Sequence, residues 1–145
     1  MLRLRRRHHH KFNISIQFSS IITEFEVRKV HELSIVEGVM NMVRENALQS
    51  NIKKVNKLKL VIGKFSMVLP DSLQFCFRAL SQDEFFRDAV LEIEQREILI
   101  QCAKCEEQFV LEDVYCYICP GCGANEVEII QGRELYLDYY EGEEN

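Results

Sequence analysis

Two C-x-x-C pairs constrain this chain more than any other feature of its sequence. The pairs are Cys102 with Cys105 and Cys119 with Cys122, and thirteen residues separate them. A two-residue spacer lets both thiolates of a pair bind one ion from a tight turn, and two such turns complete a tetrahedral sulfur site of the zinc-ribbon type. We therefore predict a structural zinc ion held by four thiolates, with no open position for a substrate.

The remaining cysteines leave alternatives open. Iron in a rubredoxin-like centre also uses two C-x-x-C turns, which would make the chain an electron carrier. Cys116 lies three residues before Cys119, so it could form a C-x-x-C pair with Cys119 in place of Cys122. We favour the pair of Cys119 and Cys122, because the glycine that follows Cys122 suits a tight turn. We expect Cys116 to be a buried or half-buried thiol on the preceding strand, and Cys76, between two phenylalanines, to be a core thiol.

The composition of the 145-residue chain favours one domain with a small metal-bound module. Its hydrophobic fraction is 47%, and no apolar run approaches the length needed to cross a bilayer. Six cysteines without a convincing signal peptide indicate metal-held thiolates in a reducing cytoplasm rather than a secreted disulfide scaffold. We therefore expect a cytoplasmic protein.

Charge divides the chain into two unequal parts. Residues 1–29 carry seven Lys or Arg against two Glu, whereas residues 30–145 carry eleven basic against twenty-one acidic residues. Nucleic-acid binding requires basic side chains that neutralise phosphates, yet residues 101–130 contain only Lys104 against six acids. A zinc-ribbon interaction or nucleic-acid-binding module is therefore the less favoured alternative function.

Residues 1–29 differ in character from the rest of the chain. Three arginines at 5–7 are followed by three histidines at 8–10, which can bind metal weakly. Apolar and polar residues then alternate at 14–18, a pattern typical of a short strand. We interpret residues 1–29 as a non-native leader or a mis-annotated start. The native chain would then begin at Val30, because GUG, a valine codon, also serves as a bacterial start.

The body of the chain, from residue 30, predicts two helices and three main strands. Ser34 and Glu37 match a capping box, so the first helix is expected to begin there, with His31 and Glu32 at or just before its start. Pro70 opens the second helix. The apolar stripes are Leu33, Val36, Met40, Val43 and Ala47 in the first helix and Leu73, Phe77 and Leu80 in the second.

Alternating apolar residues predict strands at 57–62 and 89–100, and a last strand after Gly132 in which Leu135, Leu137 and Tyr139 share one face. We expect an α+β fold, a small three-stranded sheet with two helices on one face and an inserted zinc-ribbon-like module. Residues 30–100 plus 131–145 would form the α+β domain, and residues 101–130 the zinc-binding module.

Outside residues 1–29 the sequence contains one histidine, His31. A lone histidine before a helix is more often a cap or a surface residue than a metal ligand. If Val30 is the first residue, however, the imidazole of His31, the terminal amine and ionised backbone amides offer nitrogen donors in one plane. That geometry suits Ni(II) and Cu(II), and Glu32 can orient the imidazole or add an oxygen ligand.

These features together resemble the HypA/HybF family of hydrogenase nickel-incorporation proteins, small metallochaperones for NiFe-hydrogenase maturation. The resemblance covers residues 30–145. It rests on the opening Val-His-Glu-Leu-Ser-Ile at 30–35, on the four cysteines, and on Gln-Gly-Arg-Glu-Leu at 131–135. The family begins Met-His-Glu, so Val30 stands where the family has its initiating methionine.

The resemblance implies a nickel metallochaperone, not an enzyme, that carries Ni2+ as cargo and keeps Zn2+ as a structural ion. It implies nickel binding at the native amino terminus by His31 with Glu32. The implied zinc ligands are Cys102, Cys105, Cys119 and Cys122. Its partners would be the hydrogenase large subunit and a GTP-hydrolysing nickel-insertion protein, and for some members of the family also urease maturation proteins. We expect it to bind neither nucleic acid nor a membrane. We expect a monomer or a weak homodimer.

Overall fold

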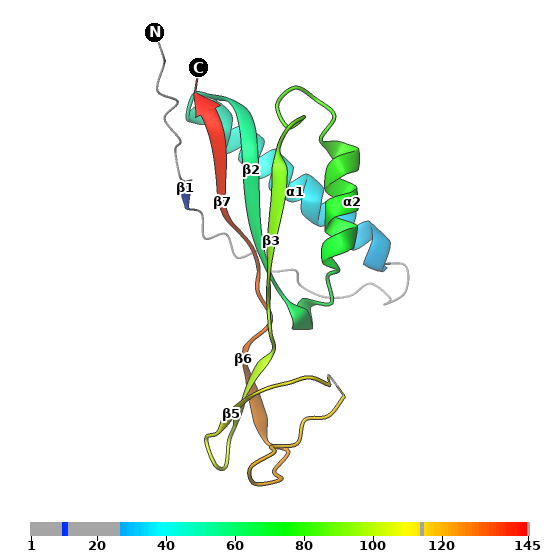
Figure 1. Cartoon of the computed structure of the whole chain (residues 1–145), viewed down its shortest axis with the longest axis vertical. Helices are drawn as coiled ribbons and strands as arrows, with labels where there is room; N and C mark the ends of the chain where they lie inside the picture. The colour runs from blue at the N-terminus through cyan, green and yellow to red at the C-terminus, as the bar shows by residue number, and fades with distance from the viewer. Residues whose placement is uncertain (1–9, 12–26, 114, 145) are drawn as a thin grey trace.

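The computed structural model describes residues 10–11, 27–113 and 115–144, which form two sheets and two long helices (Figure 1). In chain order the elements are β1 (His10–Lys11), α1 (Val27–Gln49), β2 (Ile52–Gly63), the 3-10 turn η1 (Lys64–Ser66), α2 (Pro70–Leu80), β3 (Val90–Arg96), β4 (Leu99–Cys102), β5 (Gln108–Val110), β6 (Val127–Gln131) and β7 (Leu135–Glu144). Neither long helix in this part of the chain has the length and apolar character that a bilayer crossing demands. The strand predicted at 14–18 and the histidine side chains at 8–10 lie outside the described residues.

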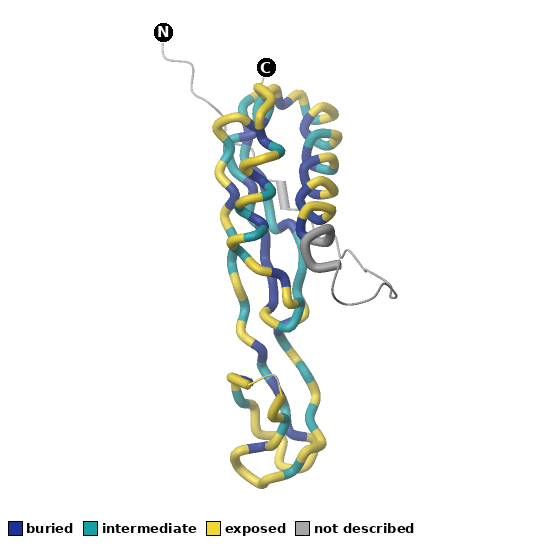
Figure 2. The backbone as a smooth tube through the Cα atoms, turned by 90° about the vertical axis from the view of Figure 1, so that its right-hand side faces the viewer, coloured by how far each residue is buried: buried dark blue, intermediate teal, exposed yellow. Residues whose placement is uncertain are grey.

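The larger sheet has the strand order β1-β7-β2-β3, with β2 antiparallel to β7 and parallel to β3. Both helices cover one face of it (Figure 1), and buried residues gather where the strands meet the helices (Figure 2). The main core includes Val36, Val39 and Val43 of α1, Leu58, Leu60 and Ile62 of β2, and Leu73 and Phe77 of α2. The predicted α+β fold, with a three-stranded sheet and two helices on one face, is confirmed; β1 adds a two-residue strand at the edge.

Helix α1 begins at Val27, earlier than its capping-box signal predicted. Residues 27–33 contain no glycine or proline, so nothing in this stretch interrupts a helical backbone. An N-cap residue has a non-helical backbone, whereas Ser34 lies within α1 and so cannot be the cap. His31 and Glu32 therefore lie inside the helix rather than before it. The predicted stripe is buried except for Leu33, whose side chain is 39% exposed.

A β-bulge in β7 changes which of its side chains face the core. The pairing with β2 shifts after Lys59, so Asp138 has no opposite residue on β2. Leu137 and Tyr140 are both buried, although strict alternation would place them on opposite faces. The prediction that Tyr139 shares the face of Leu137 is therefore wrong. The ring of Tyr139 instead lies 5.8 Å from the ammonium nitrogen of Lys59.

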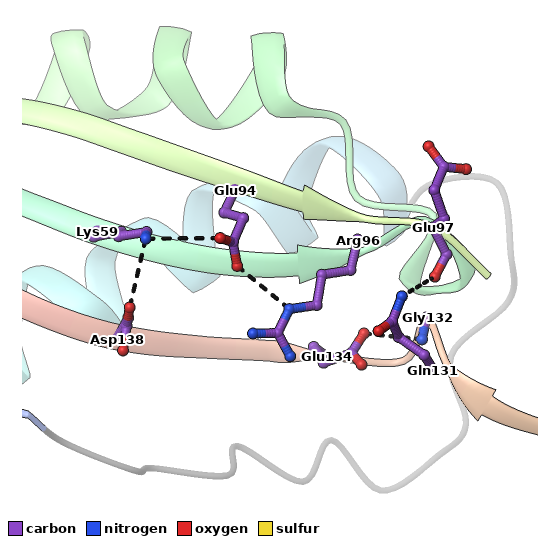
Figure 3. Close-up of polar contacts among 8 residues, drawn as sticks. All are labelled: Lys59, Glu94, Arg96, Glu97, Gln131, Gly132, Glu134 and Asp138. Carbon is purple, nitrogen blue, oxygen red and sulfur yellow. Dashed lines mark hydrogen bonds and ion pairs between the residues drawn. The ribbon is translucent and has the colours of Figure 1, made fainter. Parts of the chain in front are cut away.

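The sheet face opposite the helices carries a ladder of charges. Lys59 pairs with both Glu94 and Asp138, each at 3.7 Å, and Arg96 donates to Glu94 at 3.3 Å (Figure 3). These side chains are between 19% and 43% exposed, so each pair contributes at most about 1 kcal/mol. The charged side chains make this face of the sheet polar, in contrast to the apolar face that packs against the helices.

The second sheet is small and antiparallel, with the order β5-β4-β6 and a core of Ile98, Ile100 and Leu111. It projects from the end of the larger sheet (Figure 1) and is mostly exposed (Figure 2). The single strand predicted at 89–100 is in fact two strands, β3 and β4, which belong to different sheets.

Close backbone contacts join the two sheets at a neck formed by the end of β2 and the start of β7. The N–H of Gly63 donates to the carbonyl of Glu134 at 2.7 Å, and the N–H of Phe65 donates to the carbonyl of Gly132 at 2.9 Å. The N–H of Gly132 in turn donates to the Glu134 carboxylate at 2.9 Å (Figure 3). A Cβ on Gly63 would lie 1.9 Å from the carbonyl oxygen of Gly132, so only glycine fits there.

Candidate metal centre

The four predicted zinc ligands lie in two turns of the second sheet. Cys102 ends β4 and Cys105 follows in the next turn, whereas Cys119 and Cys122 lie in the turn before β6. The peptide bonds adjoining both turns are paired: the N–H of Cys102 donates to the carbonyl of Glu107 at 2.9 Å, and the N–H of Cys119 donates to the carbonyl of Ala124 at 2.8 Å. The small sheet thus holds the two turns facing each other.

The sulfur atoms of the four cysteines gather at one point. All four Sγ atoms lie within 4.8 Å of one another. The Sγ atoms of Cys102 and Cys122 are 3.6 Å apart, and those of Cys105 and Cys119 are 3.5 Å apart. A tetrahedral ion with metal–sulfur bonds of about 2.3 Å would place neighbouring sulfurs about 3.8 Å apart. The cluster therefore fits a structural zinc ion whose ligands are all thiolates.

Backbone amides around the cluster favour the thiolate forms that a metal requires. The N–H groups of Cys105 and Lys104 lower the pKa of the Cys102 thiol to about 7, although burial opposes them. At Cys105 the N–H of Glu107 also favours the thiolate. A hydrogen bond with Cys119 and burial outweigh it and raise the pKa of Cys105 to about 12. A divalent ion would supply the positive charge that four thiolates at this spacing lack.

The other two cysteines lie outside the cluster. Cys116 is exposed, and it lies in an irregular loop rather than on a strand, so the prediction of a buried or half-buried strand thiol is wrong. The neighbouring Tyr115 is 89% exposed, and it is Tyr117 rather than Cys116 that packs against the small core around Leu111. Cys76 is half-buried on α2 and packs against the main core, in agreement with the prediction.

Glu106 belongs to the metal centre in a way that sequence reasoning missed. Its backbone is left-handed, with φ of 61°, and Gly123 has the same conformation with φ of 73°. Each residue follows the second cysteine of a C-x-x-C pair. The sequence did hold a signal for this conformation: Glu106 takes the same place after its C-x-x-C pair as Gly123 does after the other, so the two residues should share one backbone conformation.

The structure does not bring His31 and Glu32 to the cysteines. They lie in α1 on the larger sheet, whereas the cysteines belong to the second sheet. The side chain of His31 lies outside the described residues. Glu32 is 5% exposed and lines a cavity between α1 and α2. Across the described chain, the four cysteines are the only group of three or more His, Cys, Asp or Glu close enough to hold one ion.

Known proteins of similar sequence and structure point to one family. The family model described as hydrogenase/urease nickel incorporation, metallochaperone, hypA matches residues 30–142. Hydrogenase maturation factor HypA of Moorella thermoacetica is 40% identical over 114 residues, which cover 79% of this chain and 100% of the relative. The same factor of Campylobacter jejuni is 35% identical over 109 residues, covering 74% of this chain and 95% of the relative.

Solved structures agree in fold. The solution structure of the Ni metallochaperone HypA from Helicobacter pylori superposes with a TM-score of 0.53 at 23% identity, covering 79% of this chain and 98% of that one. Another solution structure of a HypA protein gives a TM-score of 0.58 at 24% identity, covering 78% and 96%. Because the family model and the closely matched sequences span nearly the whole body, the chain belongs to the HypA family of hydrogenase and urease nickel-incorporation metallochaperones.

Proposed function

We propose that this protein binds Ni(II) at an amino terminus formed by Val30, His31 and Glu32, and delivers it to NiFe-hydrogenase during maturation. The observation that carries the proposal is the family match, which starts at residue 30 and includes His31 and Glu32. The receiving protein would be the hydrogenase large subunit, assisted by a GTP-hydrolysing partner. The protein itself would act in the cytoplasm as a carrier, without catalysis, as a monomer or a weak homodimer.

The helix geometry explains why the chain end matters. In an α-helix the N–H of residue 31 donates to the carbonyl of residue 27, so with α1 starting at Val27 this amide is engaged within the helix. In a chain that begins at Val30, the first four N–H groups have no acceptor in the helix, and a free amine lies next to His31. Only the shorter chain therefore offers amine, amide and imidazole nitrogens together for a planar Ni(II) site.

We further propose that the two metals belong to separate parts of the chain. Residues 30–100 with 131–145 would form the nickel-binding α+β domain, and residues 101–130 the zinc-binding module, with residues 1–29 a leader outside both. A four-sulfur site has no open position and holds its ion, whereas a site at a chain end can exchange its ligands one at a time. The cargo can then leave without disturbing the structural ion.

Calorimetry tests the nickel site. The protein is released from a cleavable fusion so that Val30 is its first residue, loaded with zinc to occupy the cysteines, and titrated with Ni2+. We expect a dissociation constant in the micromolar range, equivalent to about −8 kcal/mol, and binding about tenfold weaker or more for His31→Ala and for the full-length chain. Cys116→Ser should bind like the parent.

Two results would count against the proposal. Equal affinity of the parent and His31→Ala would remove His31 from the site. Equal affinity of the full-length and shortened chains would show that the terminal amine is not a ligand, because the amine of Val30 exists only in the shortened protein.

A further inference from the structure

Helices α1 and α2 border a cavity of about 510 Å³. Its lining includes Glu32 and Leu33 from α1 and Asp71, Phe75, Cys76 and Ala79 from α2. The cavity is thus built from both helices, and it includes the residue directly after His31. No basic residue is among the described residues that line it.

Glu32 is the unusual member of this lining. Its side chain is 5% exposed, yet no hydrogen bond or ion pair reaches it from the described part of the chain. Glu32 lines the cavity, so its side chain is within reach of a ligand bound there. A carboxylate with this little exposure attracts a cation that enters the cavity, because little water screens the pair.

Besides Glu32, the lining combines the apolar Leu33, Phe75 and Ala79 with the polar Asp71 and Ser72. Leu33 is 39% exposed and Phe75 is 67% exposed, although both are large hydrophobic residues on helices. Such an apolar surface around a nearly buried acid matches a side chain with an apolar stem and a cationic head.

A bound metal ion fits this cavity less well. Glu32, Asp71 and Cys76 all line it, but their ligand atoms do not come close enough together to surround one ion; within the described residues only the four zinc-site cysteines do so. The mostly apolar remainder of the lining also supplies few further ligands.

We propose that this cavity binds a lysine or arginine side chain of a protein partner, with the stem against Leu33 and Phe75 and the charged head beside Glu32. The occupant is a different protein because the body of this chain, residues 30–145, is strongly acidic and a second copy would repel it. The binding itself requires no nickel. Only the biological role of this binding, which is to bring the nickel acceptor next to His31, rests on the proposed function.

A matched pair of small molecules probes the cavity in the full chain. N-butylguanidinium has the stem and head of arginine, and N-butylurea is a neutral analogue of nearly the same shape. We expect nickel-free titrations followed by backbone amide NMR to show shifts at Glu32, Leu33, Phe75 and Ala79 with the guanidinium, and binding about tenfold weaker for the urea.

Three variants make the titration specific. Glu32→Gln should abolish the preference for the cation, whereas Glu37→Gln, an exposed acid on the same helix, should keep it. His31→Ala removes the proposed nickel ligand and should leave guanidinium binding unchanged, so failure of the nickel proposal and failure of this one are distinguishable.

Other outcomes overturn the inference. Equal binding of the two probes, or shifts confined to residues away from the cavity, would show that Glu32 does not recognise a cation. Self-association of the full chain that Glu32→Gln abolishes would identify a second copy as the occupant instead of a partner protein.

Discussion

Glu106 and Gly123 occupy equivalent left-handed positions in the two C-x-x-C turns, with φ of 61° and 73°. The N–H of Glu106 donates to the carbonyl of Cys102 at 3.1 Å, and the N–H of Gly123 donates to the carbonyl of Cys119 at 2.9 Å. Glycine adopts this conformation freely, whereas the Cβ of a glutamate crowds the following carbonyl at a cost of about 1–2 kcal/mol. The first turn therefore carries strain that the second does not.

Replacing Glu106 by glycine should stabilise the zinc-loaded protein. The relieved backbone strain exceeds the extra entropy that glycine gains in the unfolded chain, so we expect a net gain of about 0.5–1 kcal/mol in the free energy of unfolding. Urea titration measures it. Glu106→Ala removes the same charge but keeps a Cβ, so it controls for electrostatics. A Glu106→Gly protein no more stable than Glu106→Ala would show that the turn is unstrained.

Substituting Cys119 by serine should release zinc and unfold the second sheet. Cys119 is 1% exposed in a module whose small core shares no residue with the main one. Structural zinc supplies roughly 10–16 kcal/mol of apparent binding free energy in small modules, far more than this core can replace. NMR spectra should lose the dispersed signals of 99–131 and keep those of the helices and the larger sheet.

Cys116→Ser provides the control for this experiment. Because Cys116 is exposed and outside the sulfur cluster, the variant should retain one zinc ion per chain by elemental analysis. Loss of zinc from Cys116→Ser would mean that this cysteine is a ligand. Iron in the purified parent, with thiolate-to-iron absorption, would instead identify an electron carrier.

Local sequence signals were sufficient for much of the fold. The C-x-x-C spacing and the glycine after Cys122 predict which thiols gather, because a metal-binding turn is a local structure. Helical periodicity predicts the stripe from Val36 to Ala47 for the same reason, and Pro70 marks the start of α2. His31 and Glu32 as nickel ligands stay a prediction.

Features decided by distant contacts could not be predicted. Asp138 is bulged because β7 pairs with β2 across a long sequence separation, and this bulge places Tyr140 rather than Tyr139 in the core. The division of 89–100 into two strands depends in the same way on which sheet each half joins. At the start of α1, the capping box at Ser34 predicted the wrong first residue, because the residues before Ser34 continue the helix back to Val27.

The neck between the sheets should tolerate no side chain at Gly63. A Cβ there would lie 1.9 Å from the carbonyl oxygen of Gly132, a backbone atom that cannot move without displacing β7. We expect Gly63→Ala to reduce the free energy of unfolding by about 2–3 kcal/mol, measured by urea titration. Gly38→Ala is the matched control, because nothing lies within 4 Å of the added Cβ. It should stabilise α1 by about 0.5–1 kcal/mol. Equal effects would argue against close contact at the neck.

Asp83 should make the stability of the protein depend on pH through its pair with Arg44. The Arg44 guanidinium lies over the Phe85 and Phe86 rings, at 5.2 and 5.1 Å, and donates to Asp83 at 2.6 Å. Burial alone would raise the pKa of Asp83. The hydrogen bonds from Arg44 and from the N–H of Phe86 outweigh burial and lower it below 3.8. Both charged side chains are about 40% exposed, so the pair is worth less than about 1 kcal/mol.

Because the folded-state pKa is depressed, this stabilisation is complete above the ordinary pKa of aspartate and disappears as the pH falls through the folded value. The difference in unfolding free energy between the parent and Asp83→Asn should therefore be largest near neutral pH and shrink below 3.8. Urea titrations at a series of pH values measure it. In an Arg44→Met background, which keeps an apolar stem against Phe85 and Phe86, the pH-dependent difference should largely vanish. An undiminished difference there would show that Arg44 is not its source.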